Sequence, residues 1–361
     1  MWCAVTRTYL DHAATSPLLP EVDAAMAPWR GRPVNPSSVH QEGRRAADAL
    51  EEARADVARL VGRPPAGIVF CSGATEANHS AIRGLASLGH RRIAAAGIEH
   101  PSVHAALQAA RVEVVSLAVG ADGIIEVTVG DATALVCQAV NHETGVIQPI
   151  AEALATGLPV HVDATAAAGR VELALADAAT VALTAHKLGG PVGIGALSLC
   201  DGDGFPALIG GAQERGRRGG TPDVIGAVGF AAACRAAIQR AEVASEHRRR
   251  LDDHLRSGLT ALGAAPVGAW ARTAPGTTCF TLPGILGETV VQALDLAGYA
   301  VSSGAACASG SVGPSPVLTA MGHAEPRGAV RVSAGPGTTR DEIDGLLAAL
   351  GAFLARRSAS Y

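Results

Sequence analysis

Residues 68–76 read Ile68-Val69-Phe70-Cys71-Ser72-Gly73-Ala74-Thr75-Glu76, an apolar run followed by a small-residue turn and the start of a helical pattern. The short apolar run, which breaks at Ser72-Gly73, predicts a strand that is buried on both faces. The turn places free backbone N–H groups at the start of a helix, where the helix dipole suits a phosphate. Every α/β protein has such turns, so this stretch predicts a fold more firmly than a ligand.

The same alternation of strand, turn and helix continues on both sides of this stretch. Apolar positions recur at steps of four and three over residues 43–61, which predicts an amphipathic helix closed by Gly62. Unbroken apolar strands separated by helical stretches predict an α/β fold with a mostly parallel sheet covered on both faces. The further apolar runs lie at residues 92–95, 112–117, 135–140, 159–162 and 181–184.

The pattern changes near residue 240. A long arginine-rich helix is followed by short strands around residues 277–282, 299–302 and 330–333. A last helix opens with the capping box Thr339-x-x-Glu342. We therefore expect a large domain over residues 16–251, and a smaller α+β domain made of residues 1–15 and 252–361.

Composition excludes several classes of protein. The net charge of −4 over 361 residues provides no basic field for nucleic acid. No apolar run approaches the roughly 20 residues of a membrane span, and the N-terminus does not resemble a signal peptide. The 7 cysteines include no Cys-x-x-Cys pair, which argues against a zinc site and against a disulfide framework. We expect a protein without a metal, in the reducing cytoplasm.

Lys187 is the only lysine among the 29 lysine and arginine residues. A compositional preference for arginine explains why the others are absent, but not why this one remains. Unlike arginine, a lysine amine can lose its proton near neutral pH and condense with a carbonyl. Lys187 ends an apolar run and precedes two glycines, which is a poor place for a solvated charge. We interpret it as a Schiff-base lysine.

Three other residues are candidates for chemistry. Asp163 closes an apolar strand, where a buried carboxylate needs a cationic partner such as a protonated pyridine nitrogen; a helix N-cap explains it equally well. His100 also follows a strand, although a lone histidine is more often structural than catalytic. Cys307 lies among serine, glycine and alanine in residues 302–314, which predicts a mobile loop that brings a thiol to a site. The alternative is a tight strand connection with an incidental cysteine.

The chain also carries an ordered series of short motifs that together resemble one family. They resemble those of the cysteine desulfurases of the NifS/IscS type, in class V of the aminotransferase-like pyridoxal phosphate (PLP) enzymes, from about residue 9 to residue 345. The resemblance implies the PLP-dependent transferase fold of type I. The motifs are Tyr9-Leu10-Asp11-His12-Ala13-Ala14-Thr15, Asn35-Pro36-Ser37-Ser38-x-His40, Ser72-Gly73-Ala74-Thr75-Glu76, Glu99-His100, His161-Val162-Asp163-Ala164-Thr165, His186-Lys187, Glu214-Arg215-Gly216-x-Arg218-x-Gly220-Thr221, Ser302-Ser303-Gly304-x-Ala306-Cys307 and Val330-Arg331-x-Ser333.

The resemblance implies how the cofactor is bound. Lys187 would bind PLP covalently and then move protons, Asp163 would keep the ring nitrogen protonated, and His100 would stack on the ring as an acid or base. A fifth residue, Thr221, would reach the phosphate of the other subunit's cofactor, which implies a homodimer with shared active sites. Four residues would hold the phosphate within their own subunit. The four are Ala74, Thr75, His186 and Thr184, the last in place of the family's usual serine.

The resemblance also implies how the substrate is handled. Asn35 and Arg331 would bind L-cysteine, with Arg331 pairing in a bidentate way with its carboxylate. Cys307 would attack the substrate sulfur as a thiolate, leave a persulfide on the enzyme and release alanine. The persulfide sulfur would then pass to an acceptor protein.

Two positions depart from the family pattern. The chain has Asn141-His142-Glu143-Thr144-Gly145 where the family usually has Asn-Asn-Glu-x-Gly, and Ala166 where it usually has the glutamine of Asp-Ala-x-Gln. Both missing amides would hydrogen-bond the phenolic oxygen of PLP. Ala166 cannot do so, and we infer that His142 donates one N–H in compensation.

Three functions follow as hypotheses. The leading one is a PLP-dependent L-cysteine desulfurase that supplies persulfide sulfur. The second is a carbon–sulfur lyase, or another class V reaction, which would not need Cys307. The third is a catalytically silent scaffold for a sulfur-relay partner, against which the retention of Lys187 argues.

Overall fold

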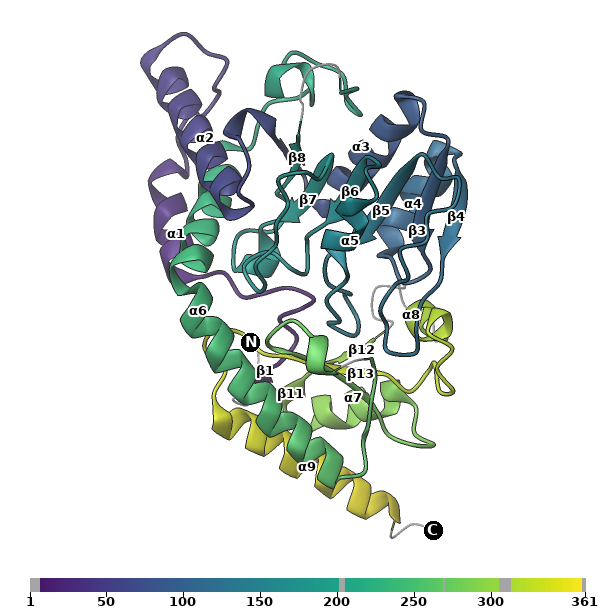
Figure 1. Ribbon diagram of the computed structural model, residues 1–361. Coiled ribbons are helices and arrows are strands. Elements are labelled where there is room, and N and C mark those ends of the chain that lie inside the picture. The colour runs from purple at the N-terminus through teal and green to yellow at the C-terminus, as the bar shows by residue number, and fades with distance from the viewer. Residues whose placement is uncertain (1–6, 201–204, 269, 305–312, 359–361) are drawn as a thin grey trace.

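A computed structural model describes residues 7–200, 205–268, 270–304 and 313–358. A seven-stranded sheet and a four-stranded sheet lie one above the other, and the long helix α6 (Val224–Ala261) runs along both (Figure 1). A third, two-stranded sheet joins β1 (Thr8–Tyr9) to β11 (Tyr299–Ala300) in parallel, so the start of the chain lies against the C-terminal part.

The seven-stranded sheet has the order β2-β8-β7-β6-β5-β3-β4. The five strands from β7 to β4 are parallel, whereas β8 is antiparallel to both of its neighbours. The predicted mostly parallel sheet is therefore confirmed. The strands are β2 (Ile68–Cys71), β3 (Arg92–Ala96), β4 (Glu113–Leu117), β5 (Ala134–Gln138), β6 (Val160–Asp163), β7 (Thr180–Thr184) and β8 (Gly195–Leu199).

Helices cover both faces of this sheet because successive side chains of each strand point to opposite faces. On one face, α3 (Ala74–Ser87) and α4 (Pro101–Ala110) pack on alternate residues of β3 and β5. On the other, α2 (Gln41–Leu60), α5 (Ile150–Ala155) and the first half of α6 enclose the largest cluster of buried side chains. The shorter α1 (Pro20–Met26) packs on α6.

The four-stranded sheet is antiparallel, in the order β12-β13-β10-β9, and packs with α7 (Gly287–Leu296), α9 (Arg340–Ser358) and the second half of α6 in a separate core. Its strands are β9 (Ala265–Pro266), β10 (Thr277–Thr281), β12 (Ser302–Ser303) and β13 (Val330–Ser333). The remaining helices are α8 (Pro316–Ala320), η1 (Ala27–Trp29), η2 (Pro65–Gly67), η3 (His186–Leu188), η4 (Glu214–Gly216) and η5 (Trp270–Arg272).

Helix α6 differs most from the sequence expectation. It begins at Val224 and continues unbroken through residues 251 and 252, so the predicted domain boundary falls inside a helix and stays a prediction. By length and composition alone α6 could cross a membrane, but 56% of its most apolar window is buried in the protein, so this is weak evidence for a span.

The capping box of α9 is confirmed: Glu342 accepts from the Thr339 N–H at 2.7 Å, and Thr339 Oγ1 accepts from the Glu342 N–H at 3.3 Å.

Candidate functional site

A small pocket lies at the carboxyl ends of the parallel strands. It brings together the sequence-predicted residues Lys187, Asp163, His100, His142 and Ala74, which are far apart along the chain. Parallel strands that end at the same sheet edge produce this convergence. The complete lining is Ala74, His100, Gln138, Val140, His142, Asp163, Thr165, Ala166 and Lys187.

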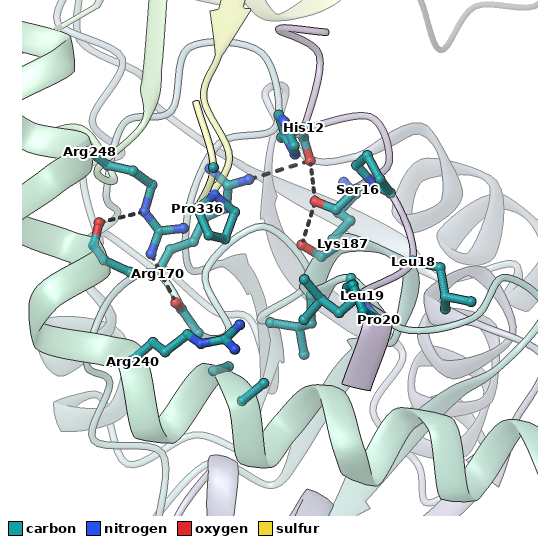
Figure 2. A pocket seen from close by; sticks show the side chains of 18 residues that line it. His12, Ser16, Leu18, Leu19, Pro20, Arg170, Lys187, Arg240, Arg248 and Pro336 are labelled. Carbon is teal, nitrogen blue, oxygen red and sulfur yellow. Dashed lines mark hydrogen bonds between the residues drawn. The ribbon is translucent and has the colours of Figure 1, made fainter. Parts of the chain in front are cut away.

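Lys187 also lines a second, larger cavity of about 290 Å³, which we call the arginine cavity (Figure 2). It lies between α6, the segment before α1 and the turn at Pro336. It is lined by His12, Ser16, Pro17, Leu18, Leu19, Pro20, Gly169, Arg170, Lys187, Leu188, Gly189, Ala236, Ala237, Arg240, Ala244, Arg248, Pro336 and Gly337.

Asp163, at the end of β6, is buried and held as an anion. Asn78 Nδ2 donates to Oδ2 at 2.9 Å, and the backbone N–H of Thr165 donates to Oδ1 at 2.9 Å. Burial alone would raise the pKa of this carboxyl, but hydrogen bonds from Thr165 and Asn78 and the neighbouring His100 lower it below its usual value. The carboxylate is thus prepared for a cation in the pocket.

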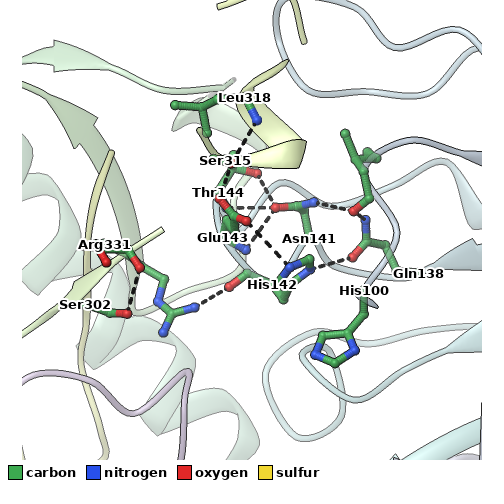
Figure 3. Close-up of polar contacts among 12 residues, drawn as sticks. His100, Gln138, Asn141, His142, Glu143, Thr144, Ser302, Ser315, Leu318 and Arg331 are labelled. Carbon is green, nitrogen blue, oxygen red and sulfur yellow. Dashed lines mark hydrogen bonds and ion pairs between the residues drawn. The ribbon is translucent and has the colours of Figure 1, made fainter. Parts of the chain in front are cut away.

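His100 caps the N-terminus of α4, and this contact decides which ring nitrogen carries the proton. Its Nδ1 accepts from the backbone N–H of Ser102 at 3.1 Å, so a neutral ring is protonated on Nε2. Burial lowers the pKa of His100, which favours that neutral form near pH 7. The ring meets His142 edge-on, with ring centroids 5.0 Å apart (Figure 3).

His142 uses its N–H on another residue of the pocket wall, Gln138 (Figure 3). Gln138 Nε2 donates to the carbonyl of Ile98, so Gln138 Oε1, 3.3 Å from His142 Nδ1, must accept. Burial, followed by repulsion from His100 and Lys187, keeps the pKa of His142 well below its usual value, so the ring is neutral with one N–H. That N–H is engaged by Gln138, which argues against the inferred donation to a cofactor.

The first turn of α3 offers a cradle beside the pocket. Gly73 precedes the helix with φ +152°, and no side chain caps the helix among the described residues. A Cβ on Gly73 would lie 3.9 Å from Thr184 Oγ1, so the end of β7 faces this turn. His186 lies in the η3 turn that also carries Lys187, and its Nδ1 is 3.2 Å from Thr15 Oγ1. The uncapped N–H groups of Ala74 and Thr75 suit an anion.

Arg331 enters from β13 of the smaller sheet. Its Nη1 donates to the carbonyl of His142 (Figure 3). Its Nη2 pairs with Asp11 Oδ1 at 2.8 Å, so Arg331 connects three segments. It is 3% exposed, and its Nε has no partner among the described residues. A buried guanidinium with an unused donor fits a further acceptor such as a carboxylate.

Two of the predicted residues that the structure describes, Asn35 and Thr221, lie on the exposed surface and do not line this pocket. Asn35 is exposed in the loop before α2, where its Oδ1 accepts from the Ser37 N–H at 3.0 Å. Thr221 is exposed in the segment before α6. Cys307 lies outside the described residues.

Sequence reasoning missed two buried polar residues of the site, Gln138 and Glu143. Gln138 ends β5 as Asp163 ends β6, so a polar residue at the end of an apolar run was the available signal. Glu143 is 3% exposed and accepts from Ser315 Oγ at 2.6 Å, and burial raises its pKa to about 7. Its position in a recognised motif did not predict that environment.

Comparisons with known proteins identify the family of the chain. The family model described as class V aminotransferase matches residues 8–346. An IscS-like cysteine desulfurase of Mycobacterium tuberculosis is 36% identical, over 96% of this chain and 96% of that protein. The structure of a NifS-like protein matches with a TM-score of 0.89 and 30% identity, over 97% of this chain and 99% of that one. A structure of SspA in complex with cysteine matches with a TM-score of 0.78 and 28% identity, over 92% and 100% of the two chains.

The leading functional hypothesis is therefore confirmed at the level of the enzyme class. The match extends over nearly the whole chain, so it covers both sheets and the segments that join them. The chain belongs to the class V aminotransferase family, as a cysteine desulfurase of the NifS/IscS type.

Proposed function

We propose that the pocket at the sheet edge binds PLP, with Lys187 as its covalent attachment. The carrying observation is that an amine, a buried anionic carboxylate and an uncapped helix start converge there from separate strands. These groups fit the carbonyl, the ring nitrogen and the phosphate of PLP in turn. Thr184, His186, Ala74 and Thr75 would receive the phosphate. The family typically uses PLP, which supports the proposal.

Bound PLP would supply a carbonyl that takes up amines and a ring that accepts electrons. Asp163 would stabilise positive charge on the ring nitrogen, because Asn78 and Thr165 hold the carboxylate as an anion. His100 would present its Nε2–H to the pocket, and Lys187 would move protons once its amine is displaced. Gln138 and His142 would form the wall where the family usually supplies amides.

The substrate we propose is L-cysteine, with its carboxylate on Arg331. The thiolate of Cys307 would attack the substrate sulfur: an S–S bond forms, the substrate C–S bond breaks, and its electron pair stays on carbon, which takes a proton to give alanine. The enzyme would keep a persulfide for an acceptor protein.

All five described cysteines are free thiols, which suits a reducing compartment such as the cytoplasm.

The test is product formation from L-cysteine in the presence of a reductant. We expect wild-type protein to release alanine and sulfide, and Cys307→Ala to release neither above background. Cys200→Ala is the matched control, because Cys200 is an exposed free thiol away from the pocket, and it should behave as wild type.

Other outcomes would identify the competing functions. Pyruvate and ammonia from both the wild type and Cys307→Ala would indicate a carbon–sulfur lyase. A protein that never becomes yellow with PLP, and takes up no borohydride-reducible label on Lys187, would indicate a catalytically silent scaffold.

A further inference from the structure

The arginine cavity carries positive charge that nothing in it balances. Among the described residues that line it there is no aspartate or glutamate, while Arg170, Arg240 and Arg248 all contribute. Arg240 has an ion pair outside the cavity lining, with Glu21 Oε1 at 2.6 Å. Within the described ranges, neither Arg170 nor Arg248 forms an ion pair within 4.0 Å.

Arg170 and Arg248 instead use only part of their hydrogen-bonding capacity, on backbone carbonyls. Arg248 is 5% exposed, and its Nε donates to Ala244 at 3.0 Å. Arg170 Nη2 donates to the carbonyl of His12 at 3.4 Å (Figure 2), while its Nη1 is buried with no partner among the described residues. Two guanidinium groups therefore line one cavity, and at least the Nη1 of Arg170 is left without an acceptor among the described residues.

Asp252 interacts electrostatically with both Arg170 and Arg248, but its oxygens are used in other hydrogen bonds. Its oxygens accept from the Gly276 N–H at 2.7 Å and from Thr278 Oγ1 at 3.3 Å. Burial, and then repulsion from Arg248 and Arg331, lower the pKa of Arg170 to about 9, with Asp252 opposing them. A guanidinium stays protonated in proteins, so the positive charge of Arg170 and Arg248 must be balanced by an anion and not by loss of a proton.

The rest of the lining decides what kind of anion fits. Apart from the arginines and from His12, Ser16 and Lys187, the side chains of the lining are apolar. A fully hydrated inorganic anion would therefore lose water against this apolar part without finding donors there. An anion with an apolar body satisfies both halves of the cavity. The apolar wall consists of Pro17, Leu18, Leu19, Pro20, Leu188, Ala236, Ala237 and Pro336.

We propose that the arginine cavity is a binding site for a small organic carboxylate, which pairs with Arg170 and Arg248 and lays its hydrocarbon part against Leu19 and α6. Because Lys187 lines both this cavity and the pocket at the sheet edge, the occupant would contact the residue that carries the proposed chemistry. The site does not depend on Cys307 or on desulfuration.

The test is the melting temperature of the protein as isolated, in low-ionic-strength Hepes buffer, titrated with butyrate. We expect a saturable rise of roughly 2 °C or more with butyrate, and none with the neutral analogue n-butanol. Arg170→Met should abolish the response and, because it removes an unbalanced buried charge, should melt higher than wild type without butyrate. A residue that only packs would lower the melting temperature instead.

Arg235→Met is the matched control, since Arg235 is also on α6 but pairs with Asp56 and does not line the cavity. It should keep the wild-type response to butyrate, and Arg248→Met provides a second test if Arg170→Met does not fold. An unsaturable response, or one that survives in Arg170→Met, would overturn the proposal. So would sulfate acting as strongly as butyrate, because the apolar wall would then have no role.

Discussion

At the scale of single residues, a line of buried polar side chains fixes the charge of Asp163. Asn78 Nδ2 donates to the Asp163 carboxylate, so Asn78 Oδ1 faces His161 and must accept from its Nε2 at 2.9 Å. His161 Nδ1 then accepts from Thr180 Oγ1 at 2.8 Å, and burial lowers the pKa of His161 to about 4, which keeps it neutral. Asp163 therefore receives donors only, and it remains anionic beneath the pocket.

Glu143 leads to a prediction on the pH dependence of stability. Burial raises its pKa from 4.5 to about 7, although Ser315 and Arg331 oppose this shift. Below pH 4.5 the carboxyl is protonated in both the folded and the unfolded protein. As pH rises from 4.5 to about 7, the unfolded chain releases this proton first, so the free energy of unfolding falls. Above that range the contribution is constant.

Glu143→Gln should remove this loss. We expect urea unfolding to show that the free energy of unfolding of the variant, relative to wild type, is higher at pH 8 than at pH 5 by up to about 3 kcal/mol. The control is Glu126→Gln, at an exposed position, which should change the free energy of unfolding by the same amount at pH 5 and at pH 8. An equal difference between Glu143→Gln and wild type at the two pH values would show that Glu143 ionises normally.

At the scale of elements, one buried ion pair joins α2, β2 and η4. Arg54 Nη1 and Nη2 contact the Glu214 carboxylate at 2.7 and 3.0 Å, and Glu214 Oε2 also accepts from the Phe70 N–H at 2.8 Å. Glu214 itself has φ +47° and Arg215 φ +58°, both in the left-handed region that non-glycine residues rarely adopt. The pair therefore holds a strained turn, which leads toward Thr221, against the sheet.

Arg54→Met should destabilise the protein by about 3–5 kcal/mol, because it leaves the Glu214 carboxylate buried without a cation. The double variant Arg54→Met/Glu214→Met should be more stable than this single variant, as a double-mutant cycle in urea would measure. The control pair is Arg92 with Glu113, which is 42% and 61% exposed, and Glu113→Gln should cost less than about 1 kcal/mol. Equal costs for the two single variants would contradict this account.

Sequence patterns predicted the elements whose burial is uniform and missed those that tertiary contacts define. Strands β2, β3, β5, β6 and β7 are buried almost throughout, and the sequence therefore predicted each to within a few residues. The edge strand β4 is mostly exposed, but its short run of valines was sufficient to predict it. Strand β8 follows a glycine-rich turn, and its antiparallel direction depends on pairing with β2 and β7, which no local pattern encodes. The start of α6 was missed because its first half is apolar all round and buried.

The candidate site shows the same division between local and tertiary information. Lys187, Asp163 and His100 stood out because each is a polar residue at the end of an apolar run. The pairing of His142 with Gln138 could not be predicted, because the two side chains meet only after the strand ends converge. Arg170, which has no ion pair with any residue that the structure describes, was not recognised either, since its surroundings come from α6 and the N-terminal segment.

At the scale of the whole molecule, the two sheets meet at Arg331. It lies on β13 of the smaller sheet, yet it binds the carbonyl of His142 beyond β5 and the carboxylate of Asp11 in the N-terminal segment. A residue that would hold the substrate carboxylate is thus positioned by both sheets. Thr221, by contrast, is exposed, and it does not line the pocket at the sheet edge of its own chain. An exposed position would suit the role that the family resemblance implies for Thr221, at the active site of a second subunit.

The homodimer with shared active sites that the family resemblance implies can be tested with mixed dimers. Each homodimer of Lys187→Ala or of Thr221→Asp should be inactive, since one lacks the amine and the other places a negative charge against the proposed phosphate. Heterodimers of the two, purified through two affinity tags, hold one site with an intact Lys187 and an intact Thr221 from opposite chains. They should recover about half of the wild-type alanine formation. The reciprocal heterodimer, wild type with Lys187→Ala/Thr221→Asp, should be inactive; if it is the active one instead, Thr221 serves its own chain.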